Sequence, residues 1–320
     1  MLTYLLLILG FVFLVKGADF FVEGSSSVAK ILKVPSLIIG LTVVAFGTSM
    51  PEASVSITAA LSGQNDLAVS NVFGSNIFNL LVVVGVCAAI KPLMVQQSIV
   101  KKEFPFLILI SALMFMFSID SFIRGGGINT ISRLDGFIFL GFFVLFLYST
   151  IRSALASRKD IKLYNDEDEI KILSPIKSMI FIVVGITMII FGGDFVVNSA
   201  SQIATSFGLS QTLIGLTIVA IGTSLPELVT SIVAANKGES DIALGNVVGS
   251  CIFNILLILG SSAVIHPIIV ASDSIYDMMI LFAAGIITYI FAIGGRIVTR
   301  LEGIAMLLMY CGFTYYIIIR

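Results

Sequence analysis

Two acidic side chains stand within long apolar stretches, each directly after a proline. Glu52 ends the motif GTSMPE of residues 47–52, and Glu227 ends the motif GTSLPE of residues 222–227. A carboxylate deep in an apolar environment is strongly unfavourable unless it is paired, protonated or bound to a cation. Because two carboxylates occur in the same local sequence, the pair predicts a cation-binding site.

The residues before each glutamate add neutral oxygen atoms. Proline lacks the N–H that would bind the carbonyl four residues earlier, which belongs to Gly47 in one motif and to Gly222 in the other. The break is therefore expected to free carbonyl oxygens beside hydroxyl side chains. The hydroxyl residues are Thr48, Ser49, Thr223 and Ser224.

A second repeated motif, GSxxxN, occurs at residues 74–79 and 249–254. Its serine and asparagine are four residues apart, so they lie on one face of a helix. The candidate ligands are Ser75, Asn79, Ser250 and Asn254. A set of ligands that are all oxygen atoms suits Na⁺ and Ca²⁺. Ca²⁺ takes about six to eight oxygen ligands. It does not suit zinc or copper, which favour cysteine and histidine ligands.

Two structural alternatives compete with ion binding. Each proline motif could be a packing kink whose glutamate is protonated or hydrogen-bonded, and small polar residues can join membrane helices without binding an ion. The presence of both motifs in duplicate favours one shared site over two independent kinks.

The motifs belong to an internal duplication. Residues 40–79 align without gaps on residues 215–254, and 24 of the 40 positions are identical. The same offset matches GADFFVEG at residues 17–24 with GGDFVVNS at residues 192–199. The two halves are therefore copies of one unit.

The composition shows what elements must hold these residues. The chain has 320 residues, of which 58% are hydrophobic and 12% charged, and its mean hydropathy is +1.11. A membrane-spanning helix needs about 20 apolar residues, so we expect an all-α polytopic membrane protein with about ten transmembrane helices. They lie near residues 2–22, 36–62, 67–90, 104–122, 134–151, 176–199, 211–236, 242–265, 276–293 and 301–318.

The one long polar stretch separates two five-helix repeats. We assign residues 1–151 to the first membrane repeat, 152–177 to a linker and 178–320 to the second repeat. An odd number of spans per repeat inverts the second copy in the membrane. With the linker in the cytoplasm, 14 lysines and arginines fall on the cytoplasmic side and three outside. This positive-inside bias predicts a cell-membrane protein with both termini outside.

Several function classes are disfavoured. The net charge of −1 argues against nucleic-acid binding. Three cysteines in apolar stretches do not indicate a disulfide framework. The motifs of zinc proteases, serine hydrolases and phosphate-binding loops are missing from the sequence, so we expect no enzyme activity and no cofactor. No feature indicates an obligatory protein partner, and the lipid bilayer is the expected surrounding.

The paired GTSxPE and GSxxxN motifs resemble those of the cation/calcium exchanger superfamily, and within it the sodium/calcium exchangers of the prokaryotic type with a short central loop. The resemblance covers essentially the whole chain. It implies that Glu52 and Glu227 are shared Ca²⁺ and Na⁺ ligands and that carbonyls of Thr48 and Thr223 complete the calcium shell. The sodium sites that it implies use Ala45 (carbonyl), Thr48, Ser49 and Ser75 on one side and Ala220 (carbonyl), Thr223, Ser224 and Ser250 on the other.

The expected function is exchange of Na⁺ for Ca²⁺ by alternating access. Asn254 stands where the potassium-dependent branch of the family has aspartate, so the resemblance implies an exchanger that does not need K⁺. The nearest alternative is a Ca²⁺/H⁺ or other cation/H⁺ antiporter, since the same carboxylates could release protons. A passive cation channel is the alternative of another class, which inverted repeats and midplane sites disfavour.

Overall fold

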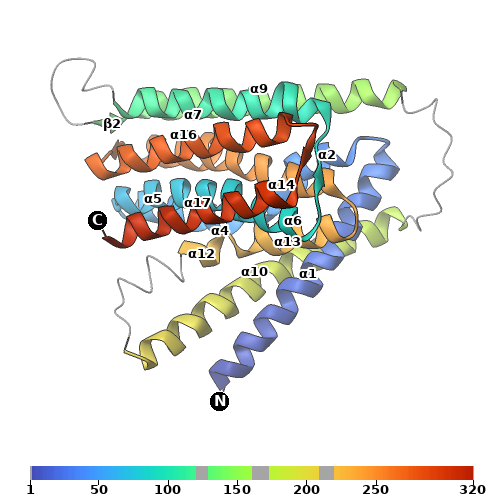
Figure 1. Cartoon of the computed structure of the whole chain (residues 1–320), viewed down its shortest axis with the longest axis horizontal. Helices are drawn as coiled ribbons and strands as arrows, with labels where there is room; N and C mark the ends of the chain where they lie inside the picture. Colours follow the sequence, from blue (N-terminus) through green and yellow to red (C-terminus); the bar gives the residue numbers. More distant parts are fainter. Residues whose placement is uncertain (1, 120–128, 161–172, 209–219, 320) are drawn as a thin grey trace.

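The computed structural model describes residues 2–119, 129–160, 173–208 and 220–319, and almost all of them are helical (Figure 1). The helical segments of the first half are α1 (Leu2–Leu32), α2 (Ser36–Ile39), η1 (Gly40–Val44), α3 (Ala45–Thr48), α4 (Met50–Leu61), α5 (Asn65–Phe78), η2 (Asn79–Val83), α6 (Val84–Ile90), η3 (Ile99–Glu103), α7 (Phe104–Ser118) and α9 (Arg133–Asp160). Those of the second half are α10 (Pro175–Ser206), α12 (Ala220–Thr223), α13 (Leu225–Asn236), α14 (Ser240–Phe253), η6 (Asn254–Leu259), α15 (Gly260–Ile265), α16 (Ser272–Ile293) and α17 (Arg300–Ile319).

Within the described ranges, seven helices are long and apolar enough to cross a membrane. An eighth span is the pair Ser36–Thr48 and Met50–Leu61, bent by 51°. The two other expected spans fall on η3–α7 and on α12–α13, but residues 120–122 and 211–219 of those predictions lie outside the described part of the chain. A membrane protein with several spans is therefore confirmed, while the count of ten stays a prediction.

Three helices are longer than expected. The predicted ranges 2–22, 134–151 and 176–199 correspond to α1, α9 and α10, which continue for several residues past the apolar run. The polar residues that follow each apolar run remain helical, because no proline interrupts the helix there. Helix α1, for example, ends just before Lys33, whose φ of 54° is the left-handed conformation common after helix ends.

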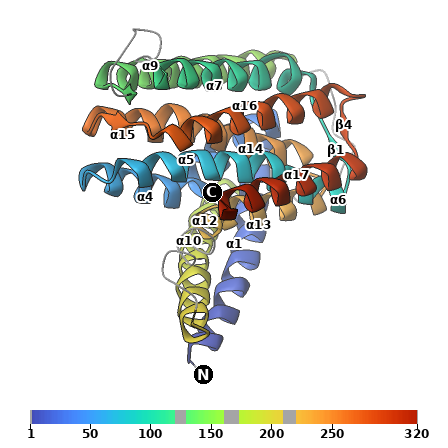
Figure 2. The ribbon, with the colours of Figure 1, turned by 60° about the vertical axis from the view of Figure 1, so that its left-hand side comes forward.

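Helices α1 and α10 form a pair that projects from the other helices (Figure 2). Glycines let their backbones touch. A Cβ atom built on Gly17 would lie 2.8 Å from the Gly185 carbonyl oxygen, and one built on Gly10 would lie 2.9 Å from the Gly192 carbonyl oxygen. Residue numbers rise along α1 as they fall along α10, so the two helices are antiparallel.

The expectation of an all-α fold needs a small correction. Strand β1 (Leu93–Met94) pairs antiparallel with β4 (Ile297–Val298), and β2 (Thr130–Ile131) pairs antiparallel with β3 (Ile268–Ile269). Lys91 and His266 precede prolines, which disfavours helix at these two positions. The extended segments that follow the helices then pair with one another.

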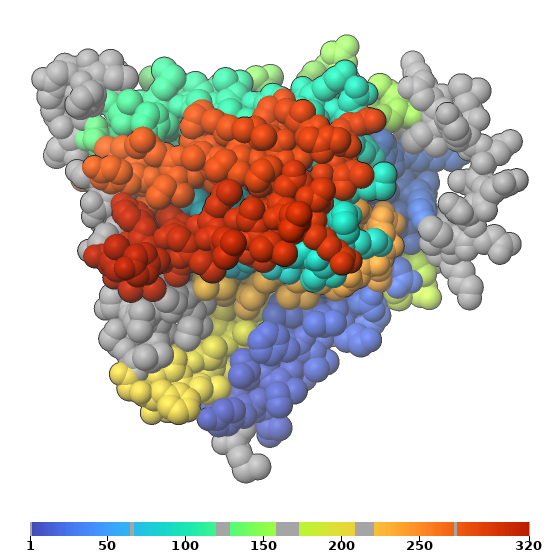
Figure 3. Space-filling view, in the orientation of Figure 1, coloured from blue at the N-terminus to red at the C-terminus, as the bar shows by residue number. Residues whose placement is uncertain are grey.

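The central helices are the most buried. In the apolar stretch of each span, 94% of the residues are buried in Ser240–Ile265 and 72% in Leu67–Ile90, against 17% in Arg300–Ile319. Helices α16 and α17, in orange-red and red, cover the middle of the face seen in Figure 3. The spans that carry Ser75, Asn79, Ser250 and Asn254 are thus the most buried of the seven.

Candidate cation site

The two proline motifs form matching breaks between short helices. Helix α3 gives way to α4 at Ser49 (φ −83°, ψ 7°), and α12 gives way to α13 at Ser224 (φ −92°, ψ 5°). Each proline is the second residue of the new helix, where its missing N–H removes no helical hydrogen bond. The motif therefore starts a new helix and places its glutamate in the first turn.

Both glutamates are fully buried, and each accepts a hydrogen bond from the other half of the chain. Ser224 Oγ donates to Glu52 Oε1 at 3.0 Å, and Ser49 Oγ donates to Glu227 Oε1 at 3.0 Å. Ser250 Oγ donates to the same Glu227 oxygen at 3.3 Å. The two breaks thus meet, which brings the two carboxylates into one site.

Several buried oxygen atoms in this region have no hydrogen-bond partner among the described residues. They are Glu52 Oε2, Glu227 Oε2, Ser75 Oγ, Asn79 Oδ1 and Asn254 Oδ1. Buried polar atoms are normally hydrogen-bonded, because losing water without a replacement costs about 1–3 kcal/mol each. Five unsatisfied oxygens from the two repeated motifs are the donor set expected of a cation site.

Two asparagines that were not predicted organise the site. Asn71 Nδ2 donates to the Glu52 carbonyl at 3.3 Å and to Ser56 Oγ at 2.9 Å. Asn246 Nδ2 makes the equivalent bonds to the Glu227 carbonyl at 3.4 Å and to Ser231 Oγ at 3.0 Å. Asn71 and Asn246 occupy equivalent positions in the aligned repeats. This identity could have indicated their role from the sequence.

The same asparagines accept hydrogen bonds across the two halves. Thr48 Oγ1 donates to Asn246 Oδ1 at 3.0 Å, and Thr223 Oγ1 lies 3.5 Å from Asn71 Oδ1. The predicted threonines are therefore in the site, with their side chains bound to these amides. The family resemblance assigns their backbone carbonyls to calcium.

The predicted alanines lie at the starts of the short helices before each break. The carbonyl of Ala45 accepts the Ser49 N–H at 3.0 Å, and a carbonyl oxygen has a second lone pair for a cation. Ala220 is the first residue of α12, and the chain before it lies outside the described residues.

Asn79 and Asn254 each begin a wide, π-helical turn, η2 and η6. Such turns are frequent at functional sites. Segment η6 packs against α4, which carries Glu52, and η2 packs against α13, which carries Glu227. Each asparagine therefore begins a segment that packs against the helix carrying the glutamate of the other half.

No group of three or more histidine, cysteine, aspartate or glutamate side chains that could hold a metal ion occurs in the described ranges. The site contains two carboxylates with hydroxyl, amide and carbonyl oxygens. This composition fits Na⁺ and Ca²⁺ and does not fit zinc or copper.

A cavity of about 470 Å³ lies beside the breaks, between α4, α10, α12 and α13. Pro51, Pro226 and Thr223 form part of its wall, and Asp194 of α10 is the one acidic residue among its described lining residues. Asp194 Oδ1 accepts a hydrogen bond from Asn198 Nδ2 at 2.8 Å. The cavity therefore adjoins one side of the site.

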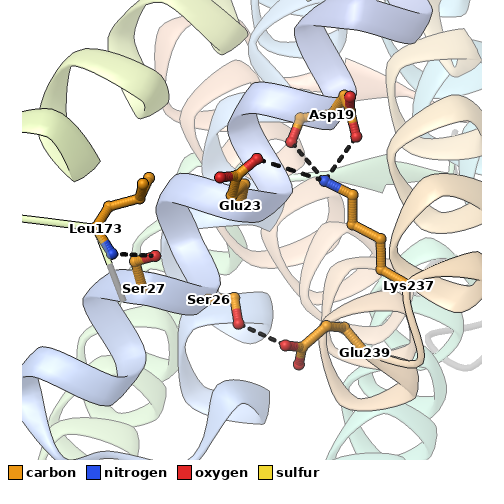
Figure 4. A network of polar contacts seen from close by, with 7 residues as sticks. All are labelled: Asp19, Glu23, Ser26, Ser27, Leu173, Lys237 and Glu239. Atoms are coloured by element: carbon orange, nitrogen blue, oxygen red, sulfur yellow. Dashed lines mark hydrogen bonds and ion pairs between the residues drawn. The ribbon is translucent and has the colours of Figure 1, made fainter. Parts of the chain in front are cut away.

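The corresponding region of the other repeat is closed. Helix α1 packs closely along α13, and Lys237 Nζ lies 2.6 Å from Asp19 Oδ1 and 3.9 Å from Glu23 Oε2 (Figure 4). Ser26 also donates a hydrogen bond to Glu239. Asp19 is the counterpart of Asp194 in the first repeat. Asp194 lines the cavity, whereas Asp19 is paired with Lys237 in the contact between α1 and the end of α13.

Comparisons with known proteins agree with this architecture. The family described as "Sodium/calcium exchanger protein" matches residues 2–152 and 177–319. The chain is 40% identical over 314 residues to the protein named "Putative antiporter CaxA" of Alkalimonas amylolytica, covering 96% of both proteins. It is 33% identical over 339 residues to the sodium/calcium exchanger MaX1 of Methanosarcina acetivorans, covering 97% of both.

Two further similarities concern structure and location. The solved structure of the sodium-calcium exchanger NCX_Mj soaked with zero Na⁺ and Ca²⁺ superposes with a TM-score of 0.83 and 29% identity, covering 99% of both chains. Inner membrane protein YrbG of Escherichia coli K12 is 37% identical over 271 residues, covering 83% of this chain and 81% of that protein. The family match spans nearly the whole chain, and the chain therefore belongs to the sodium/calcium exchanger family.

Proposed function

We propose that this protein is a secondary active antiporter that exchanges Na⁺ for Ca²⁺ at a site containing Glu52 and Glu227. The observation that carries the proposal is the reciprocal bonding of two fully buried carboxylates, each held by a serine of the other half and each retaining one unpartnered oxygen. Such a pair is stable in a membrane interior when a cation neutralises it.

The proposed ligands combine the two repeats. The transported ions are bound by Glu52, Glu227, Thr48, Thr223, Ser49, Ser224, Ser75, Ser250, Asn79, Asn254 and the carbonyls of Ala45 and Ala220. The ions are cargo, and no resident cofactor is required. One Ca²⁺ neutralises two ionised glutamates, and several Na⁺ ions do so by spreading over the larger oxygen set.

Competition for the same carboxylates explains exchange. Ca²⁺ and a full set of Na⁺ repel one another, so one cargo leaves before the other binds. Alternating access follows if the cavity beside α10 closes while the contact between α1 and α13 opens. The difference between these two regions supports this step, because equivalent segments adopt unlike arrangements in one molecule.

We propose ten spans in two inverted five-helix repeats, in a cell membrane, with both termini outside and linker 152–177 in the cytoplasm. The charge bias and the antiparallel contact of α1 with α10 support this arrangement. With Cys311, the exposed native cysteine, replaced by serine, we expect a membrane-impermeant maleimide to label D166C only in inside-out vesicles. Labelling of intact cells would reverse the proposed orientation.

The deciding experiment is ⁴⁵Ca²⁺ uptake into proteoliposomes. Vesicles loaded with Na⁺ are compared with vesicles loaded with K⁺, and with choline-loaded vesicles carrying an outward proton gradient. We expect uptake only with internal Na⁺, without a requirement for K⁺. Equal uptake in all three preparations would contradict coupled exchange.

The second candidate is a Ca²⁺/H⁺ antiporter on the same scaffold. One observation favours this candidate: the relative CaxA is named as an antiporter without its ions. Carboxylates such as Glu52 and Glu227 can also bind and release protons. Uptake driven by the proton gradient alone would select this candidate.

A further inference from the structure

One side-chain contact between the two halves breaks the symmetry of the site. Asn254 Nδ2 donates a hydrogen bond to Asn76 Oδ1 at 2.9 Å, and Asn76 Nδ2 donates to the Cys251 carbonyl at 3.3 Å. All three residues are completely buried. The contact joins α5 of the first half to α14 and η6 of the second.

The direction of these hydrogen bonds fixes both amides. The Cys251 carbonyl can only accept, so Asn76 must present its NH₂ group to it and its oxygen to Asn254. Asn254 must then donate through Nδ2, and a flipped amide would place two oxygens against each other. Its Oδ1 is consequently turned away from Asn76 and has no partner among the described residues.

The other half has no equivalent arrangement. The offset of 175 residues that relates the repeats places Cys251 opposite Asn76 and Asn79 opposite Asn254. Cysteine has no carbonyl in its side chain, and Cys251 Sγ donates to the Asn76 backbone carbonyl, at 3.9 Å. Neither Asn79 Oδ1 nor Asn79 Nδ2 has a hydrogen-bond partner in the described structure.

We propose that Asn76 is a positioning residue, which holds the Asn254 amide so that its oxygen is always presented to the transported cation. The proposal rests on the proposed function. Asn79 is not held and can rotate its amide to suit the ion. The site therefore combines one fixed amide oxygen, from the second repeat, with one adaptable amide, from the first.

The fixed oxygen lowers the entropy lost when a cation binds. Replacing Asn76 by cysteine, the residue of the other repeat, removes the hold while leaving Asn254 in place. Immobilising one freed side chain on binding corresponds to about a three- to tenfold rise in the Ca²⁺ dissociation constant. The transported ion is the probe: Ca²⁺ titrated calorimetrically into full-length protein in lipid nanodiscs, in choline buffer without Na⁺.

A double-mutant cycle separates positioning from general packing. If Asn76 acts through Asn254, N76C weakens Ca²⁺ binding by that factor in the wild-type and N79A backgrounds but by less than about 1.5-fold in N254A. The N79A background is the matched control, since Asn79 is the equivalent residue without a hold. The same factor in all three backgrounds would overturn the proposal.

The double variant N76C/C251N provides a second test. It exchanges the two side chains, so the contact between α5 and α14 still contains one asparagine and one cysteine. It moves the amide to the second repeat, where it faces Asn79. We expect the Ca²⁺ dissociation constant of this double variant to lie within about twofold of the wild-type value. That difference is smaller than the effect expected for losing one held amide. If N76C/C251N melts at the wild-type temperature but binds as weakly as N76C, Asn76 does not act by holding a ligand.

Failure of the proposed function would look different. Wild-type Ca²⁺ affinity in Glu52→Gln would remove the carboxylate site itself, whatever the cycle shows. Wild-type affinity in N254A would remove Asn254 from the site and the positioning role with it. Loss of binding in Glu52→Gln together with equal N76C effects in all backgrounds would reject only the inference about Asn76.

Discussion

At the scale of single residues, the carboxylates dominate the site because they carry its only formal charges. Replacing either Glu52 or Glu227 by glutamine keeps the oxygen that accepts the serine hydroxyl but removes the negative charge. We expect each variant to fold and to lose Ca²⁺ uptake by a factor on the order of 100, as when one partner of a buried ion pair is removed.

The measurement is ⁴⁵Ca²⁺ uptake into Na⁺-loaded vesicles with matched protein content. Glu302→Gln is the control, because Glu302 is outside the site and caps α17 through Thr299, a role that glutamine also fills. Wild-type uptake in E52Q or E227Q would refute the proposed site.

At the scale of helices, the contact between α1 and α10 depends on backbones that touch. A Cβ atom on Gly185 would lie 2.7 Å from the Gly17 carbonyl oxygen, whereas one on Gly141 of α9 meets nothing within 4 Å. We expect G185A to lower the free energy of unfolding by about 1–3 kcal/mol through this clash. G141A should raise it by up to about 1 kcal/mol through helix propensity. Titration with SDS followed by circular dichroism measures both, and equal effects would contradict the close packing.

The closed contact between α1 and the turn after α13 gives a second prediction at this scale. Lys237→Met removes the ion pairs with Asp19 and Glu23 and is expected to speed amide hydrogen exchange in residues 16–32. These groups are partly exposed, so the change is at most about fivefold, or about 1 kcal/mol. The control is Lys101→Met, which changes an exposed lysine. Unchanged exchange in K237M would mean that packing alone closes this region.

At the scale of the whole molecule, the site should respond to protons as well as metal ions. Protonating Glu52 or Glu227 removes both a negative charge and a cation ligand. We therefore expect Ca²⁺ uptake to fall as the pH is lowered from about 8 to about 5, with equal pH on both sides, and to recover at higher Ca²⁺ concentration. Inhibition that excess Ca²⁺ cannot relieve would point to protonation elsewhere.

The sequence by itself determined the membrane class, the duplication and the residue types of the candidate site. These depend on local properties: the length of apolar runs, the missing N–H of Pro51 and Pro226, and the high free energy of unpaired buried charge. It also identified Glu52, Glu227 and the serines that bind them, although it did not show which serine meets which carboxylate.

Only the tertiary structure decided how the halves interlock. Ser49 bonds to the carboxylate of the other repeat, 178 positions away, and such pairing depends on how helices pack rather than on local sequence. Asn71 and Asn246 were overlooked for the same reason, since an asparagine inside a helix serves packing or a site equally well. The unlike states of the α1 and α10 regions likewise depend on tertiary contacts, because equivalent segments of the two repeats can pack in two ways.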